Sequence, residues 1–105
     1  MMELDELRRT AHEFVDLTDH MLVAAQSGLW DEFLDVHAAR EQQMGILELE
    51  AGDSLLRKLP ELRPDFERAL ETSLHIDELA RARRDDLGEN LASFQAQRRL
   101  HSAYR

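Results

Sequence analysis

The sequence contains no cysteine, and only four glycines and two prolines among its 105 residues. The missing cysteines exclude disulfides, thiolate metal ligands and a cysteine nucleophile. Glycine and proline interrupt regular structure, so their scarcity favours long helices over a turn-rich β fold. No apolar run approaches the length that a membrane-spanning helix needs. The acidic N-terminus also lacks the basic and apolar segments of a signal peptide, so we expect a cytoplasmic protein.

Hydrophobic residues make up 43% of the chain and charged residues 33%, with a formal net charge of -9. This hydrophobic content is high enough for a folded core and too low for a membrane protein. An acidic surface repels nucleic-acid phosphates and anionic lipid, so we expect neither nucleic-acid binding nor membrane insertion. Arginines gather near the C-terminus, and a protein partner can recognise this asymmetry of charge.

Apolar residues recur at alternating spacings of three and four along most of the chain, which predicts an all-α fold. The first such stretch covers residues 3–27, and Gly28 follows it as a natural C-cap. The second stretch covers residues 30–51, and Gly52 ends it. We expect these two helices to form an antiparallel hairpin.

The rest of the chain predicts a short helical connector over residues 52–63 and one long helix over residues 64–104, with Gly88 as its weak point. About 40 helical residues span roughly 60 Å, whereas each hairpin helix spans about 30–38 Å. If the long helix starts beside the end of the hairpin, its C-terminal half overhangs. A connector that returns along the hairpin, or a bend at Gly88, would shorten the overhang. The expected architecture is a single-domain antiparallel bundle of three main helices.

The sequence contains no pattern that predicts catalysis or metal binding. None of the five histidines follows an acidic residue by three positions, as carboxylate-bridged dimetal bundles require. No serine lies in a nucleophile elbow, and the four glycines are too far apart for a phosphate loop. We therefore expect a protein that is not an enzyme and has no catalytic residues, metal or cofactor. A small helical mutase of the chorismate-mutase type remains an alternative, although it needs inward cationic residues on several helices.

Two charged residues occupy apolar positions of the helical pattern, Arg40 in the second helix and Asp77 in the long helix. A buried charge without a partner is costly. We predict that Arg40 and Asp77 pair and set the register of the two helices; the alternative is that both lie at the solvated margin of the seam. His37 lies in the same stripe as Arg40, and we expect it to be a hydrogen-bonded core residue.

The overhanging half of the long helix carries Leu87, Leu91 and Phe94 at helical spacing. If no part of the chain covers this stripe, it marks an interface with another molecule. A purely structural coiled-coil dimer is one such interface, in which a second copy covers the three residues.

The segment MLVAAQSGLWDEFL, residues 21–34, resembles the hairpin signature of FliT-type flagellar export chaperones. In that family a leucine-rich helix ends in Ala-x-x-Gly-x-Trp-Asp, and the next helix opens with an apolar pair. Two further segments look like the family, Ile76–Leu79 with Arg83–Leu87 and the terminal Ala103-Tyr104. Arg40 falls where many members carry an arginine. The resemblance covers nearly the whole chain in order.

This resemblance implies a cytoplasmic chaperone that keeps the flagellar filament-cap protein unassembled before type III export and contacts the export ATPase complex. In some bacteria such chaperones also restrain a flagellar transcription regulator. A client helix would lie in a groove lined by Trp30, Phe33, Leu87, Leu91 and Phe94. A chaperone of hook-associated proteins is the nearest alternative. The mutase-type enzyme and the coiled-coil homodimer remain as alternatives from other classes.

Overall fold

The computed structural model describes the backbone of residues 2–103 and the side chains of residues 2–88. Its long helices are α1 (Leu4–Gln26), α2 (Trp30–Glu50) and α4 (Arg63–Ala103). Between α2 and α4 lie the 3-10 turn η1 (Gly52–Ser54), the short helix α3 (Leu55–Lys58) and the 3-10 turn η2 (Pro60–Leu62). The predicted all-α fold class is therefore confirmed. Each long helix begins and ends within one residue of its expected range, except that Tyr104, the expected last helical residue, lies outside the described residues.

A glycine turn closes the hairpin of α1 and α2. Gly28 has a φ of 72°, in the left-handed region that glycine adopts without the steric cost of a Cβ. The Leu29 N–H donates to the Ala24 carbonyl at 2.9 Å, and the Gly28 N–H donates to the Ala25 carbonyl at 3.2 Å. These two bonds form a Schellman motif, which satisfies carbonyls left open at the end of α1.

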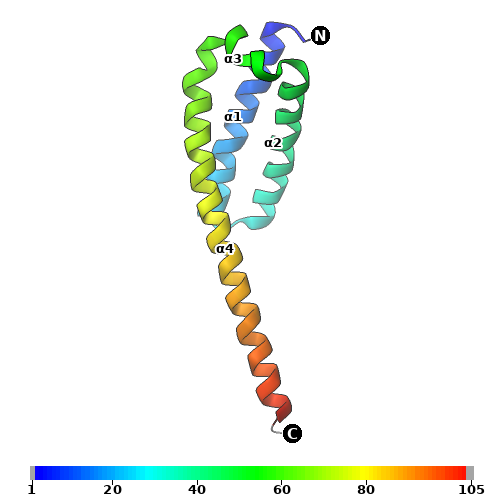
Figure 1. The fold of residues 1–105 in the computed structure, drawn as a ribbon, viewed down its shortest axis with the longest axis vertical. Helices are drawn as coiled ribbons and strands as arrows, with labels where there is room; N and C mark the ends of the chain where they lie inside the picture. Colours follow the sequence, from blue (N-terminus) through cyan, green and yellow to red (C-terminus); the bar gives the residue numbers. More distant parts are fainter. Residues whose placement is uncertain (1, 104–105) are drawn as a thin grey trace.

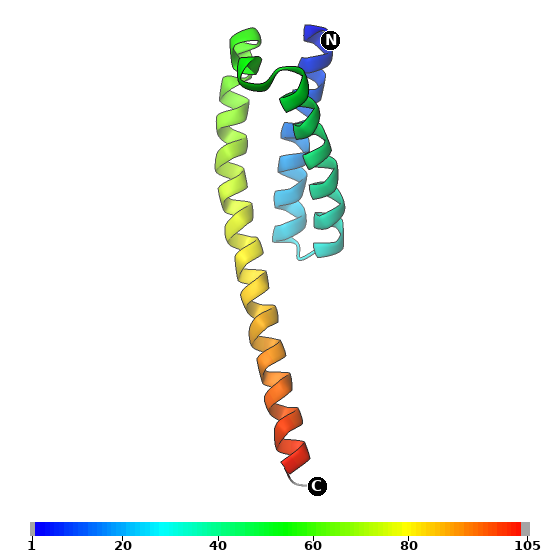
Figure 2. The ribbon, with the colours of Figure 1, turned by 45° about the vertical axis from the view of Figure 1, so that its right-hand side comes forward.

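The long helices lie side by side, with α1 between α2 and α4 in both views (Figures 1 and 2). Helix α1 packs along both neighbours, whereas α2 and α4 make little direct contact with each other. Helix α4 starts beside the end of α2, runs antiparallel to α2 and continues well past the Gly28 turn (Figure 1). The molecule is consequently a rod of 69 × 23 × 21 Å. The overhang is confirmed, and α4 passes through Gly88 as one helix.

The hydrophobic core is divided into two clusters along the bundle. The larger cluster lies at the connector end and includes Phe14, Leu47 and Leu62. The smaller cluster lies toward the Gly28 turn and contains Met21, Val36 and Ile76. Each long helix places a polar residue between its contributions to the two clusters: Thr18 in α1, Arg40 in α2 and Ser73 in α4. The core is therefore interrupted by a polar layer, to which all three long helices contribute.

The connector closes one end of the bundle with Leu55, Leu59 and Leu62, which are all buried.

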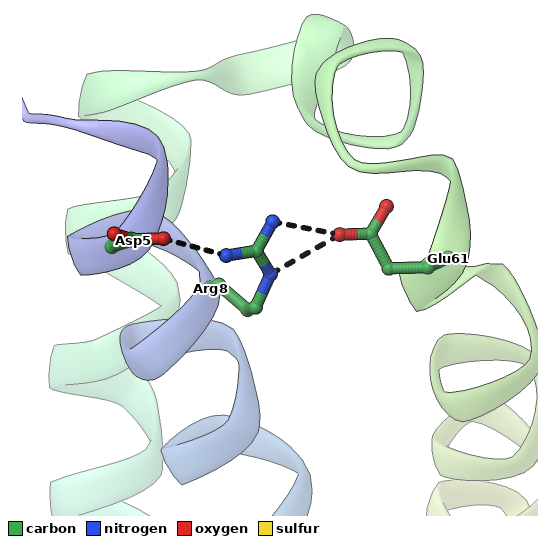
Figure 3. A network of polar contacts seen from close by, with 3 residues as sticks. All are labelled: Asp5, Arg8 and Glu61. Atoms are coloured by element: carbon green, nitrogen blue, oxygen red, sulfur yellow. Dashed lines mark hydrogen bonds and ion pairs between the residues drawn. The ribbon is translucent and has the colours of Figure 1, made fainter.

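An exposed cluster of charges links the connector to the start of α1 (Figure 3). The Arg8 guanidinium donates to Asp5 Oδ1 at 2.7 Å and, through Nε and Nη2, to Glu61 Oε1 at 3.1 and 3.0 Å. The hydrogen bonds from its own backbone N–H and from Arg8 lower the pKa of Glu61. Because these groups face solvent, their contribution to stability is small.

Candidate functional site

Arg40 is the centre of the polar layer and connects all three long helices. From α2, its Nε donates to Thr18 Oγ1 of α1 and its Nη2 donates to Ser73 Oγ of α4, both at 2.8 Å. Thr18 Oγ1 donates its own hydrogen to the Phe14 carbonyl at 2.9 Å, and Ser73 Oγ donates to the Ala69 carbonyl at 2.8 Å. Each hydroxyl therefore turns a lone pair toward the guanidinium.

The charge of Arg40 is held in largely apolar surroundings. Its guanidinium carbon lies 4.8 Å from the centroid of the Phe14 ring, a distance typical of a cation–π contact. Burial lowers the pKa of Arg40, while the neighbouring Glu41 carboxylate raises it. Arginine stays protonated under such shifts. Among the side chains of residues 2–88, no carboxylate forms an ion pair with Arg40.

The predicted pair of Arg40 and Asp77 is not what the structure contains. Asp77 forms an ion pair with Arg81, one turn farther along α4, with 2.8 Å between Arg81 Nη2 and Asp77 Oδ2. The side chain of Asp77 is 57% exposed. Ser73, one turn earlier, faces Arg40 instead. A hydroxyl loses less hydration free energy on burial than a carboxylate does, so the serine occupies the inner position. Asp77 thus follows the alternative, at the solvated margin of the seam.

The expectation that His37 is a core residue is also wrong. His37 is exposed, and its ring stacks on Phe33 with 6.5 Å between the centroids. The apolar stripe of α2 is wider than the surface that α1 covers, so His37 lies at its uncovered edge.

A groove runs between α2 and α4, with α1 as its floor, because the two outer helices flank α1 without closing on each other. We call it the α2/α4 groove. It has two hollows, of about 520 Å³ toward the Gly28 turn and about 180 Å³ toward the connector, and Arg40 and Ser73 line both. The other residues that line the larger hollow are Met21, Phe33, Leu34, His37, Leu74, Ile76, Asp77 and Ala80. Those that line the smaller hollow are Phe14, Met44, Phe66, Ala69 and Leu70.

Three of the lining residues are leucines that face solvent. Leu34 on α2 is 61% exposed, and Leu70 and Leu74 on α4 are 64% and 60% exposed. These leucines place apolar surface on both walls of the α2/α4 groove, which suits the groove to an apolar helix face. The pattern of apolar residues did not predict this groove. One feature of the sequence could have indicated the groove. With Leu74, the apolar stripe on α4 is wider than a single neighbouring helix can cover.

The predicted partner-binding residues lie partly beside the α2/α4 groove. Trp30 and Phe33 pack edge to face with 5.2 Å between their ring centroids, and Phe33 also lines the groove. The Arg83 guanidinium of α4 lies 6.0 Å from the centroid of the Trp30 ring. Leu87, one turn farther along α4, is 51% exposed. The remaining two predicted residues, Leu91 and Phe94, lie outside the described side chains, so this site stays a prediction.

Other kinds of site find no support in the part of the chain that the structure describes. There, no three His, Cys, Asp or Glu residues gather closely enough to hold a metal ion. None of the described helices has the combination of length and apolar character that crossing a bilayer requires.

A family model described as flagellar protein FliT matches residues 8–105. The chain belongs to the FliT family. This membership confirms the resemblance seen in the hairpin and at the C-terminus, and the FliT family is a family of flagellar export chaperones. The matched range includes the polar layer and both walls of the α2/α4 groove. No curated protein and no solved structure matches the chain.

Proposed function

We propose that this FliT-family chain is a cytoplasmic chaperone of the flagellar filament-cap protein. It covers an assembly-prone helix of that client, keeps the client unassembled before type III export and delivers it to the export ATPase complex. The observation that carries the proposal is the open α2/α4 groove with exposed leucines on both walls.

The dimensions of the α2/α4 groove suit an amphipathic helix. The α4 wall runs from Phe66 to Ala80, which corresponds to about 21 Å, or four helical turns. Burying the exposed parts of Leu34, Leu70 and Leu74 would contribute about 3–5 kcal/mol before the costs of ordering the client. A client helix with apolar residues at i, i+3, i+4 and i+7 would bury all three.

The shape and charge of the groove favour a chaperone over the mutase-type enzyme. Such an enzyme would need an enclosed pocket with inward cationic residues from several helices. The α2/α4 groove is open along the helix axes, and among the residues that the structure describes Arg40 is the one arginine or lysine that lines its two hollows.

The client contact also extends to the overhang of α4 in this proposal. Phe33 lies at the end of the α2/α4 groove and packs on Trp30, so a client helix that leaves the groove there meets Trp30 and then the overhang of α4. In the sequence of this overhang, Leu87, Leu91 and Phe94 recur at helical spacing. Phe94→Asp is expected to abolish client binding and leave the helical content, measured by circular dichroism, unchanged. Loss of the fold in this variant would instead assign Phe94 to the core.

The test is capture of partners from a lysate of the source organism by the tagged chain, with mass spectrometry of the retained proteins. Recovery of the filament-cap protein or of export ATPase components supports the proposal. Leu74→Asp should reduce this recovery, whereas Leu49→Asp, a matched control on α2 at an 84% exposed leucine outside both hollows, should not. Recovery of neither partner, together with a homodimer by light scattering, would favour the coiled-coil dimer.

A further inference from the structure

Arg40 has capacity for a ligand beyond the contacts that hold the three helices together. A guanidinium carries five N–H donors in a planar fork. Two of them bind Thr18 and Ser73, and the other three have no hydrogen-bond acceptor among the side chains and backbone of the described residues. Arg40 also lines both hollows of the α2/α4 groove, so it lies at their junction, about midway along the groove.

A client helix that covers this junction must satisfy the charge that it buries. Arg40 is partly buried already, and an apolar helix face laid across the groove would remove more of its hydration. A carboxylate that accepts two parallel N–H bonds from the guanidinium would compensate this loss, because such bidentate pairs are short and strong. An entirely apolar helix face has no such compensation and is disfavoured.

We propose that the α2/α4 groove selects a client helix with one aspartate or glutamate near the middle of its apolar stripe, and that Arg40 binds this carboxylate. The inference rests on the proposed chaperone function and adds the chemistry of the docking segment. The acidic residue has apolar neighbours three or four positions to either side, which occupy the hollows next to Leu70 and Leu74.

The charges around the groove limit the client to a single well-placed carboxylate. The chain carries a net charge of -9, so a broadly acidic client segment would be repelled. Asp77, the acidic residue that lines the groove, is already paired with Arg81. Arg40 therefore provides a local positive site within an acidic body.

The experiment uses the full chain and overlapping synthetic peptides that cover the filament-cap protein, with binding measured by fluorescence anisotropy. The tightest peptide is then compared with a copy in which the mid-stripe Glu or Asp is replaced by Gln or Asn. We expect the amide peptide to bind about tenfold to hundredfold more weakly, as for the loss of charge-assisted hydrogen bonds. This comparison alters only the peptide, so it does not depend on the folding of any variant.

Arg40→Gln completes a double-mutant cycle with the peptide pair. We expect this variant to bind the carboxylate and amide peptides with equal, weakened affinity, because the two changes remove the same interaction. Ser73→Ala is the matched control: it removes one hydrogen bond from Arg40 but keeps the charge, so it should still prefer the carboxylate peptide. A purely structural role of Arg40 would leave the preference for the carboxylate peptide intact in Arg40→Gln.

Three results would overturn the inference. Equal binding of the carboxylate and amide peptides to the unmodified chain would refute the role of Arg40 and leave the chaperone function standing. A homodimer that Leu74→Asp dissociates would show that a second copy occupies the groove. Failure of both the peptides and the intact filament-cap protein to bind would refute the proposed function, and this inference with it.

Discussion

Replacing Thr18 by valine is expected to lower the free energy of unfolding by about 1.5–3 kcal/mol, the range for a hydrogen bond to a charged group. Thr18 is fully buried, and its Oγ1 accepts the 2.8 Å bond from Arg40 Nε. Valine keeps the shape and β-branching of threonine and has a similar helix propensity. The main loss is therefore the acceptor, which leaves Arg40 Nε without a partner in the polar layer.

Thr10→Val is the matched control for this prediction. Thr10 is also a buried threonine of α1, and its hydroxyl donates to the Glu6 carbonyl at 2.9 Å, as that of Thr18 does to Phe14. No guanidinium bonds to Thr10 in the described part of the chain. Losing a hydroxyl bond to the carbonyl four residues earlier is nearly neutral, so we expect a change within about 0.5 kcal/mol.

Urea unfolding followed by far-ultraviolet circular dichroism measures both variants. For a domain of this size, a loss of about 2 kcal/mol also lowers the melting temperature by about 10 °C. If Thr18→Val and Thr10→Val shift the unfolding midpoint by the same amount, the Arg40 contact contributes nothing and the reasoning about the polar layer is refuted.

Further predictions concern the backbone, the core and the charges. Gly45 lies within α2, and nothing lies within 4 Å of an added Cβ, so Gly45→Ala should raise the free energy of unfolding in urea by about 0.8–1 kcal/mol. Gly28→Ala should lower it by about 1–2 kcal/mol, because Gly28 has a positive φ. Leu62→Ala should lower the unfolding free energy by about 2–5 kcal/mol, since Leu62 is completely buried in the connector; an unchanged midpoint would contradict the packing of the connector. The lowered pKa of Glu61 means that its small stabilising contribution is present above its ordinary pKa of 4.5 and is lost as the pH falls through the lowered value. Arg8→Ala should raise the pKa of Glu61 in a nuclear magnetic resonance titration, and an unchanged pKa would exclude a role for Arg8.

The helices could be predicted from the sequence because their signals are local. Heptad spacing identifies each helix, and Gly28 and Gly52 supply the positive φ angles, 72° and 53°, at which the hairpin helices end. The overhang follows from the unequal helix lengths once the connector places α4 beside the end of α2. The connector was less predictable, because the burial of Leu55, Leu59 and Leu62 depends on where two 3-10 turns carry the chain.

The polar layer and the α2/α4 groove could not be predicted in the same way. The heptad pattern places Arg40 and Ser73 on the inner faces of their helices, but it does not determine how the helices rotate about their axes. That rotation decides whether Arg40 meets Ser73 or Asp77, which are only one turn apart on α4. The groove depends likewise on how far α2 and α4 are splayed across α1, a tertiary property that no local pattern contains.

If this FliT-family chain is a chaperone of the filament-cap protein, it must slow or prevent the assembly of that client. Light scattering of the purified filament-cap protein, with and without an excess of the chain, reports on assembly. We expect the chain to suppress the rise in scattering, Leu74→Asp to lose this activity and Leu49→Asp to retain it. Unchanged assembly of the filament-cap protein in the presence of the folded chain would contradict the proposed chaperone function.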